Sequence, residues 1–403
     1  MKAGWATKPL GEVIQINPPK REVQGRLRPD QPVSFVPMED LGELQRRFAP
    51  QRDRPLADVY GSYTYFAEND VLLAKITPCF ENGKLGISRG LESGVGFGSS
   101  EFMVLRCPQL LTPEYLFYFL SRKEFREIGR GRMTGAVGHK RIPPDYVRSI
   151  NIPLPPLEEQ RRIVAILDEA FEGLDRARAN AEANLASTQD VFDAYLTQVF
   201  TDPPAEWEAA TLGAKCHRIT VGHVGPMANR YVQRGIPFLR SQNVRPFRID
   251  LSDVKFIDDA FMGELRKSEL RPGDVAIVRT GYPGTAAVIP DDLPLANCAD
   301  LVIARPGPGL SPHFLAMLLN SSFGKSHVAH VSVGAAQQHF NVGAAKASVF
   351  PLPTRPTQER LAERAAEIRE QTESLEKSIR QKIADISALR QSLLQKAFAG
   401  ELT

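Results

Sequence analysis

The sequence predicts an α/β fold in which two strand-rich domains of similar plan are joined by two long helices. Three observations lead to this prediction. The two halves of the chain match each other segment by segment, each half contains short apolar runs typical of strands, and each half ends in a long heptad-like stripe. At 403 residues the chain also exceeds what one hydrophobic core ordinarily serves.

The internal repeat begins at the two tryptophans of the chain, which share the pattern W-x4-L-G at Trp5–Gly11 and Trp207–Gly213. Six segments match in the same order, and chance could produce one such match but not six in register. A unit of this length is too long for a solenoid, so the pattern indicates a duplicated domain. The matched segments are 5–11 with 207–213, 33–41 with 236–244, 69–78 with 273–283, 100–106 with 299–305, 111–120 with 310–319 and 133–140 with 332–339.

Within each half, continuous apolar runs bounded by Gly- and Pro-rich turns predict strands. The clearest runs are Val71–Ala74, Phe102–Leu105, Val275–Val278 and Leu301–Ala304. One short helix per half is predicted over Leu111–Phe125 and Leu310–Phe323. Each of these helices opens on Thr-Pro or Ser-Pro, where proline is tolerated at the first helical position.

A proline-rich junction ends each half, and the pattern after it changes to a helix. Apolar residues recur at three- and four-residue spacing through 157–200 and 361–398. About 40 residues at ~1.5 Å each give roughly 60 Å of helix. Neither helix can bury its stripe on a small domain, so we expect the two to pack on each other in a coiled coil. The alternative is that each helix awaits a partner chain.

These patterns divide the chain into four parts. We expect a first domain at 1–153, a central spacer helix at 154–201, a second domain at 202–353 and a C-terminal spacer helix at 354–403.

Charge is distributed unevenly along these parts. Residues 1–155 carry 22 Lys and Arg against 17 Asp and Glu, whereas residues 156–200 carry 4 against 9. A basic excess in the long segments suggests a polyanionic partner, and scatter of surface charge is the alternative explanation. No apolar run approaches the ~20 residues of a membrane span, and no signal peptide is evident. With four cysteines and no C-x-x-C pair, we expect reduced thiols and a cytoplasmic protein.

Motifs typical of catalysis are incomplete. The N-P-P-K stretch at 17–20 lacks the aromatic residue with which an amino-methyltransferase stacks its base, and G-K-S at 324–326 lacks the upstream glycine of a P-loop. The pairs His217 with His223 and His327 with His330 have no third ligand at metal spacing. The sequence therefore predicts no catalytic site, no metal and no cofactor in this chain.

Loops in both halves are rich in groups that bind phosphates and base edges. Arg and Lys suit phosphate and guanine, whereas Gln and Asn suit adenine. A solvated helix end followed by a mobile loop is the alternative reading of the longest basic stretch, 122–141. The candidate DNA-binding residues are Lys75, Thr77, Arg130, Arg132, Thr134, His139, Lys140 and Arg141 in the first half, and Arg240, Gln242, Asn243, Arg279, Thr280, Tyr282, Gln337, Gln338, His339 and Asn341 in the second.

The chain resembles the specificity subunit of Type I restriction-modification systems along essentially its full length. The resemblance is carried by I-P-L-P-P-L-E-E-Q-R-R-I-V-A-I-L-D at 152–168, by F-P-L-P at 350–353 with T-Q-E-R at 357–360, and by the ending L-L-Q-K-A-F-A-G-E-L-T at 393–403. The opening W-x4-L-G also fits. The second junction departs from the first, because it has R-P-T-Q-E-R where the first has P-L-E-E-Q-R.

The resemblance implies two target-recognition domains, each of which reads one half of a gapped duplex DNA site. It also implies that two long antiparallel coiled-coil helices join the domains and set the gap. It implies no catalysis in this chain. Two methyltransferase subunits that use S-adenosylmethionine, and restriction-translocase subunits that use ATP with magnesium, would be the partners. The family's reading residues vary and do not transfer by motif, so the candidate contacts above rest on residue chemistry and location.

Two other functions compete with this interpretation. The chain could be a coiled-coil assembly scaffold that binds no DNA, or a self-sufficient DNA methyltransferase. The missing cofactor and N-P-P-aromatic motifs argue against the methyltransferase.

Overall fold

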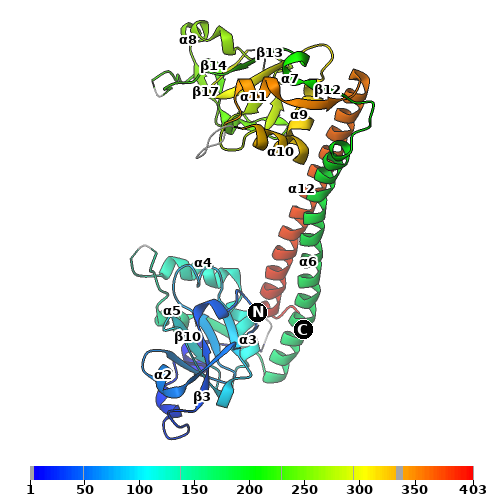
Figure 1. Ribbon diagram of the computed structural model, residues 1–403. Helices are drawn as coiled ribbons and strands as arrows, with labels where there is room; N and C mark the ends of the chain where they lie inside the picture. The colour runs from blue at the N-terminus through cyan, green and yellow to red at the C-terminus, as the bar shows by residue number, and fades with distance from the viewer. Residues whose placement is uncertain are drawn as a thin grey trace. The chain divides into compact units, whose positions relative to one another are not determined.

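The structure is a computed structural model, which describes residues 4–48, 50–136, 138–227, 229–293, 295–332 and 339–402. The chain divides into two compact units (Figure 1). Unit 1 consists of residues 1–181 and 382–403, and unit 2 consists of residues 182–381. Both units combine sheets with helices, so the predicted α/β class is confirmed.

Unit 1 is built on two mixed sheets and one strand pair. The first sheet has the order β2-β10-β7-β8-β4, the second has the order β5-β3-β9-β6, and β1 pairs with β11. The strands are β1 (Ala6–Pro9), β2 (Gln15–Ile16), β3 (Pro32–Val36), β4 (Arg47–Phe48), β5 (Arg52–Pro55), β6 (Thr64–Ala67), β7 (Val71–Ala74), β8 (Leu85–Ser88), β9 (Val95–Gly98), β10 (Phe102–Arg106) and β11 (Asn151–Leu154). The predicted strands at β7 and β10 are confirmed, and both are buried.

Unit 2 repeats this plan. Its main sheet has the order β13-β21-β18-β19, a second has the order β17-β14-β20, and β12 pairs with β22 as β1 pairs with β11. The strands are β12 (Glu208–Thr211), β13 (Cys216–Val221), β14 (Ile236–Leu239), β15 (Val244–Arg245), β16 (Arg248–Ile249), β17 (Lys255–Ile257), β18 (Val275–Val278), β19 (Ala286–Val288), β20 (Asn297–Cys298), β21 (Leu301–Pro306) and β22 (Val349–Leu352). The parallel pair β14–β20 matches the parallel pair β3–β9, so the duplication extends to strand direction.

Short helices complete the two units. In unit 1 they are α1 (Leu10–Val13), α2 (Leu56–Tyr60), α3 (Pro113–Leu120), α4 (Lys123–Arg132) and α5 (Pro144–Ser149), with the 3-10 turns η1 (Lys20–Val23), η2 (Met38–Asp40) and η3 (Glu92–Gly94). In unit 2 they are α7 (Leu212–Lys215), α8 (Asp259–Glu264), α9 (Pro312–Asn320), α10 (Ser322–Val331) and α11 (Val342–Ala347), with η4 (Ser241–Asn243) and η5 (Arg266–Ser268).

A single helix was predicted over Leu111–Phe125, and this prediction is wrong in one respect. Two helices, α3 and α4, follow β10. Arg122 has an extended backbone between α3 and α4, and the Ser121 hydroxyl donates back to the Phe117 carbonyl. Unit 2 breaks at the same place, where Ser321 has an extended backbone and caps the start of α10. The helices α3 and α9 are almost wholly buried, whereas α4 and α10 bury only some of their residues.

The Leu-Gly of the repeated W-x4-L-G marks a close approach of two helices. Leu10 and Leu212 are buried in the two cores. A Cβ placed on Gly11 would lie 3.1 Å from the Arg148 Cβ, and one on Gly213 would lie 3.0 Å from the Lys346 carbonyl oxygen. The glycines therefore let α1 pack on α5 and α7 pack on α11.

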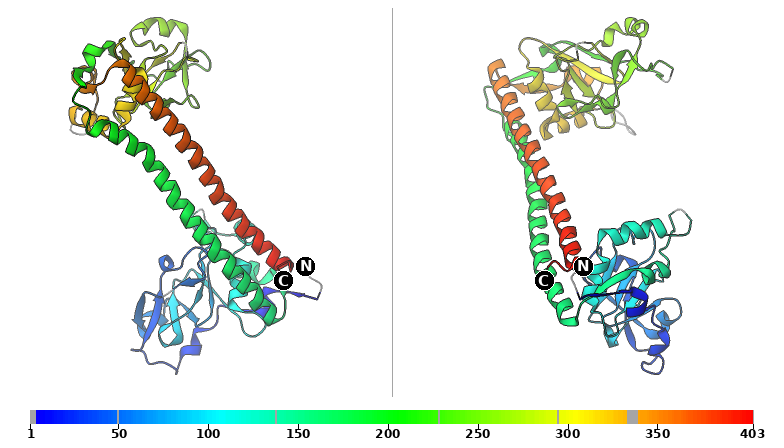
Figure 2. Two further views of the ribbon diagram at one scale, coloured as in Figure 1. Left: turned by 90° about the vertical axis from the view of Figure 1, so that its right-hand side faces the viewer. Right: turned by 180° about the vertical axis from the view of Figure 1, so that it is seen from behind.

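Two unbroken helices, α6 (Leu157–Thr201) and α12 (Arg355–Ala399), each run for 45 residues and enter both units. In unit 1 the start of α6 lies beside the end of α12 (Figure 2), where Phe171 and Phe398 share one core. In unit 2 the end of α6 packs with the start of α12, where Phe200 and Ala365 share a core. The helices are therefore antiparallel within each unit, as predicted.

A buried glutamine explains why the proline-rich junction occurs twice. The Gln160 side chain accepts from the Thr112 amide at 3.0 Å and donates to the Leu110 and Pro155 carbonyls at 2.8 and 3.0 Å. Gln358 repeats these three bonds in unit 2. Both glutamines are almost fully buried, so each fastens the first turn of its long helix to the loop ahead of α3 or α9.

We expect Gln160→Ala to destabilise unit 1 by about 1–3 kcal/mol, because the substitution leaves one buried amide and two carbonyls without partners. Denaturant unfolding of a Trp207→Phe background, in which Trp5 alone reports on unit 1, measures the change. Arg161→Ala at the exposed neighbouring position is the control and should change the unfolding free energy little. Equal effects of the two variants would contradict the fastening role.

Candidate nucleic-acid interface

In unit 1 the structure brings two candidate segments together. Thr134 and Arg141 face each other across an antiparallel bridge, and Arg141 bridges to Ile76. The Thr77 amide donates to the Lys140 carbonyl at 2.9 Å, and the Ile142 amide donates to the Lys75 carbonyl at the same distance. The end of β7 and the loop after α4 therefore form one surface, although they lie far apart in the sequence.

That surface is exposed and basic. Arg130 and Arg132 occupy the last turn of α4, and both side chains face solvent. Thr134, His139 and Lys140 are likewise exposed. Lys75 and Thr77 are half-buried. Lys75 donates to the Ser100 carbonyl, and Thr77 donates to Glu81. The sequence predicted these residues as DNA contacts, and their exposure is compatible with that role.

Arg141 is bound by a carboxylate that sequence reasoning did not select. Its Nε donates to Glu101 Oε2 at 2.9 Å and its Nη2 donates to Oε1 at 2.6 Å, while Nη1 donates to the His139 carbonyl at 3.1 Å. The hydrogen bonds from Arg141 lower the pKa of Glu101. The carboxylate therefore stays ionised and holds the guanidinium in place.

Unit 2 assembles its candidates at the equivalent position. The Phe340 amide donates to the Arg279 carbonyl at 3.1 Å, as Ile142 does to Lys75 in unit 1. Arg279 Nη1 and the Thr280 hydroxyl donate to the two oxygens of Asp300 at 2.7 and 3.0 Å. His339 is half-buried beside this segment, and Gln337 and Gln338 lie outside the described residues.

Tyr282 stands at the tip of the turn that follows Arg279 and Thr280. Its side chain is 84% exposed. Gly281 and Gly284, on either side of it, have φ of +84° and +89°, a conformation that favours glycine. A large aromatic ring with so little protein contact is free to meet a partner molecule.

The R-S-Q-N run of unit 2 fits the prediction less well. Asn243 is buried, its Oδ1 accepts from the Arg240 amide at 3.0 Å, and its Nδ2 donates to the Asp250 carbonyl at 2.9 Å. It is a structural residue of the turn and cannot reach a ligand, which corrects its selection as a DNA contact. Arg240 and Gln242 both donate to Asp253, so one carboxylate restrains two candidates.

Asn341 also has a local structural role. Its side-chain oxygen accepts from the Ala344 amide at 2.9 Å and caps the start of α11. The side-chain NH2 group remains for other contacts.

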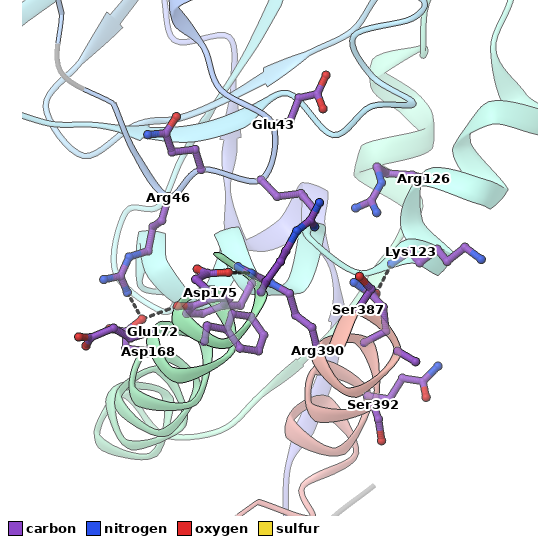
Figure 3. Close-up of a pocket in the computed structure, with 18 of the residues that line it drawn as sticks. Glu43, Arg46, Lys123, Arg126, Asp168, Glu172, Asp175, Ser387, Arg390 and Ser392 are labelled. Atoms are coloured by element: carbon purple, nitrogen blue, oxygen red, sulfur yellow. Dashed lines mark hydrogen bonds and ion pairs between the residues drawn. The ribbon is translucent and has the colours of Figure 1, made fainter. Parts of the chain in front are cut away.

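A groove of about 1290 Å³ in unit 1 separates the sheets from the two long helices (Figure 3). Asp168 on α6 accepts from both Arg46 and Tyr118, and Asp175 accepts from Arg390 at 2.6 Å. Burial raises the pKa of Tyr118, so its hydroxyl remains protonated. Asp168 and Asp175 of α6 are thus each paired with an arginine that lines the same groove.

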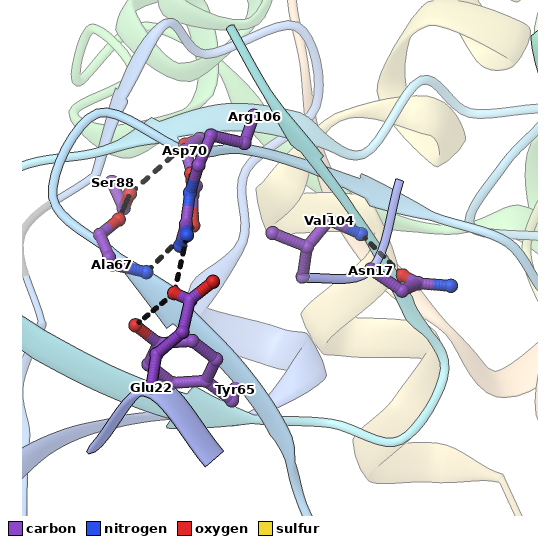
Figure 4. A network of polar contacts seen from close by, with 8 residues as sticks. All are labelled: Asn17, Glu22, Tyr65, Ala67, Asp70, Ser88, Val104 and Arg106. Carbon is purple, nitrogen blue, oxygen red and sulfur yellow. Dashed lines mark hydrogen bonds and ion pairs between the residues drawn. The ribbon is translucent and has the colours of Figure 1, made fainter. Parts of the chain in front are cut away.

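A second polar cluster in unit 1 is also structural (Figure 4). Arg106 donates from Nε and Nη2 to the two oxygens of Asp70, each at 2.7 Å, and from Nη1 to Glu22 at 2.6 Å. Unit 2 repeats the bidentate pair with Arg305 and Asp274, again with two distances of 2.7 Å. These pairs tie the start of β7 or β18 to the end of β10 or β21.

The described part of the chain shows no sign of a metal site, a membrane span or a reactive thiol. Within it, no group of His, Cys, Asp and Glu has the arrangement of a metal site, and no helix has the length and apolarity to cross a bilayer. The four cysteines are unpaired, and burial raises the pKa of Cys107, Cys216 and Cys298. Thiols that stay protonated are weak nucleophiles.

The same frame occurs in both units, and the segments after β7 and β18 carry surface loops at equivalent positions. Residues 2–183 match the family model described as the type I restriction modification DNA specificity domain. The resemblance to Type I specificity subunits is thereby confirmed.

Curated relatives support the same family. The chain is 34% identical over 204 residues to the specificity subunit of the type I restriction enzyme EcoEI of Escherichia coli, covering 50% of this chain and 34% of that protein. It is 32% identical over 194 residues to the EcoAI specificity subunit of E. coli, covering 48% and 32%. The matches therefore span about a third of the length of these two relatives. The EcoKI specificity subunit of E. coli K12 is 23% identical over 355 residues, covering 82% and 76%.

Two solved structures share the fold. A chain from a structure on complex assembly and conformational transition of the type I R-M system has a TM-score of 0.80 at 22% identity, with 100% of this chain and 99% of that chain covered. The HsdS subunit from Thermoanaerobacter tengcongensis has a TM-score of 0.66 at 21% identity, with 100% and 98% covered. The two-domain, two-helix architecture is thus shared along the whole chain.

Proposed function

We propose that the chain is the sequence-specific DNA-recognition subunit of a Type I restriction-modification complex, and that each recognition domain reads one half of a gapped duplex site. One observation carries the proposal. The same frame occurs twice, and in both copies the segment after β7 or β18 lies beside the segment before α5 or α11, with different side chains displayed. Two domains that share a fold but differ in their surface side chains are suited to recognise two different short DNA sequences.

The cations of unit 1 fall into two groups with different uses. No hydrogen bond or ion pair is recorded for the side chains of Arg130, Arg132 and Lys140 within the described residues, and all three are exposed. Such cations are suited to bind DNA phosphates, and contacts to phosphates do not depend on the base sequence. Arg141 is instead held by Glu101, as a group that must recognise one base edge should be.

The long helices supply the spacing and the docking surface in this proposal. Two methyltransferase subunits would bind the helix pair and its junctions, and restriction-translocase subunits would join them. Catalysis, S-adenosylmethionine and ATP with magnesium would belong to those partners, and this chain would hold no cofactor. The helix starts differ, since α6 carries Glu158 and Glu159 in its first turn and α12 carries no acid there. The two docking sites would therefore be unequal.

Binding of the full chain to a randomised duplex library should enrich a gapped bipartite sequence. Affinity should also fall steeply with salt, because each phosphate contact releases counterions and contributes about −0.9 to the slope of log K against log salt. Gel shifts at several salt concentrations measure both, alone and with methyltransferase subunits added. Equal binding of the enriched site and random duplex would contradict the proposal.

A further inference from the structure

An acidic residue occupies the same position in both units, one residue before the central strand. Glu101 precedes β10 and Asp300 precedes β21, in the matched segments S-E-F-M-V-L-R and A-D-L-V-I-A-R. Both lie within the surface proposed above to meet DNA, where phosphates would repel them. A carboxylate kept at such a place in both copies needs an explanation.

In unit 1 the carboxylate leaves one edge of the arginine available. A guanidinium has five N–H donors in a fixed fork. Glu101 takes the Nε–Nη2 edge of Arg141, and the His139 carbonyl takes a third donor on Nη1. The two donors that remain are one on each terminal nitrogen. The Arg141 side chain is 45% exposed, so part of it faces solvent.

The charge of the pair favours a base over a phosphate. The positive charge of Arg141 is largely offset by Glu101, so the pair gains little from a nearby phosphate. Two parallel donors held rigidly match O6 and N7 of guanine in the major groove, where arginine binds in bidentate fashion. Glu101 also restrains the Arg141 side chain before DNA binds. Arg141 therefore loses less rotamer freedom on binding than an unrestrained arginine would.

Unit 2 has an acidic residue at the same position as unit 1, but the arginine paired with it comes from a different segment. Asp300 holds Arg279, whose position corresponds to Lys75, while His339 stands where Arg141 stands in unit 1. The Thr280 hydroxyl donates to the second oxygen of Asp300 and fixes the carboxylate. The acid is thus the constant part of the site, and the strand or loop that provides the arginine differs.

We propose that Glu101 and Asp300 are positioning residues that aim Arg141 and Arg279 at guanine, so that each half-site contains a guanine whose recognition depends on the acid. The proposal rests on the proposed function, since it names how the same surface recognises its bases. It assigns to two acidic residues a role in specificity that their charge alone would not suggest.

The test compares Glu101→Gln with Arg141→Ala in selections by the full chain on a randomised duplex library. Arg141→Ala should lose the preference for one guanine of one half-site by about 10- to 100-fold. Glu101→Gln should weaken the preference at the same guanine, yet leave binding to random duplex equal or stronger, because a negative charge has gone. If the role of Glu101 were merely structural, Glu101→Gln would lower both the preference for the guanine and the affinity for random duplex. Asp300→Asn should affect the other half-site only.

Controls keep the outcomes separate. Asp58→Asn, on exposed α2, removes one negative charge away from this surface and should leave the enriched sequence unchanged. Asp300 has φ of +50°, and asparagine tolerates that conformation, so Asp300→Asn should keep the turn. Replacing the selected guanine with 7-deazaguanine should weaken wild-type binding but change Arg141→Ala little.

Each result bears on one claim. If the wild type enriches no gapped sequence, the proposed function fails. If it enriches one, but Arg141→Ala keeps every guanine preference or Glu101→Gln behaves as wild type, the positioning role is overturned. Thermal unfolding of each variant identifies any that fails to fold, and Glu101→Asp then replaces Glu101→Gln. The shorter acid should retain the guanine at reduced preference, and full retention would overturn the proposal.

Discussion

Asp274→Ala should destabilise unit 2 by about 3–5 kcal/mol, because it leaves the guanidinium of Arg305 partly buried without its counter-charge. Asp274 is 1% exposed in its side chain and Arg305 is 26% exposed. The acid also accepts from the Arg271 amide at 2.9 Å, so its loss leaves a turn amide unpaired as well. The substitution therefore removes both a buried ion pair and the bond that closes the turn before β18.

Unfolding of unit 2 can be followed separately, because each unit contains one tryptophan. In a Trp5→Phe background, Trp207 is the single tryptophan and packs against the unit 2 core. Denaturant unfolding monitored by its fluorescence gives the change in unfolding free energy. Glu367→Ala is the control, since its ion pair with Arg364 is exposed and should contribute less than about 1 kcal/mol.

The double variant Asp274→Leu with Arg305→Met distinguishes a lost charge partner from lost packing. Replacing both members of a buried ion pair with apolar residues is often close to neutral, whereas removing one member is costly. We therefore expect the double variant to be more stable than Asp274→Ala. If the double variant is the less stable of the two, the unpaired arginine is not the cause of the destabilisation.

The residues of the ion pairs Asp70–Arg106 and Asp274–Arg305 are repeated in the sequence, but hydrophobic periodicity does not predict that they pair. The acid of N-D-V and G-D-V and the arginine that ends M-V-L-R and V-I-A-R are repeated in both halves. The repeats were sufficient to predict β7, β10, β18 and β21. Pairing Asp70 with Arg106 required knowing that β7 and β10 are antiparallel neighbours, which places the start of one strand beside the end of the other. Strand order is a tertiary property that local patterns do not contain.

The junctions show the same limit. The first turn of α6 carries acidic residues, whereas the first turn of α12 carries none. The residue that both junctions share is the glutamine, whose function depends on the loop ahead of α3 or α9 and so appears only in the folded structure.

Candidate contacts were selected by residue type, and type alone does not separate base readers from turn residues. Asn243 and Asn341 bind the backbone of their own turns, because a short amide side chain serves caps as readily as it serves adenine. The basic residues before α5 lie exposed together, and their role as DNA contacts stays a prediction. Their acidic partner Glu101 was passed over, since an acid is not expected beside DNA.

Charge reversal at Lys140 and Arg141 should lower affinity for duplex DNA by about 100-fold at low salt, with a smaller loss at high salt. Lys140→Glu replaces an exposed cation with an anion on the surface of unit 1. Arg141→Glu adds a second carboxylate beside Glu101, so it removes the proposed base contact and also introduces repulsion. Because both side chains are exposed, folding should be unaffected, and thermal unfolding checks this.

Lys140→Glu and Arg141→Glu should affect different aspects of DNA binding. Lys140→Glu should weaken binding to all sequences alike and reduce the slope of log K against log salt, as loss of a phosphate contact does. Arg141→Glu should also alter the enriched sequence at one guanine. Arg28→Glu, in the turn between η1 and β3, makes the same charge change at another exposed site and is the matched control. If Arg28→Glu weakens binding as much as Lys140→Glu, net charge accounts for the effect and the loop before α5 does not meet DNA.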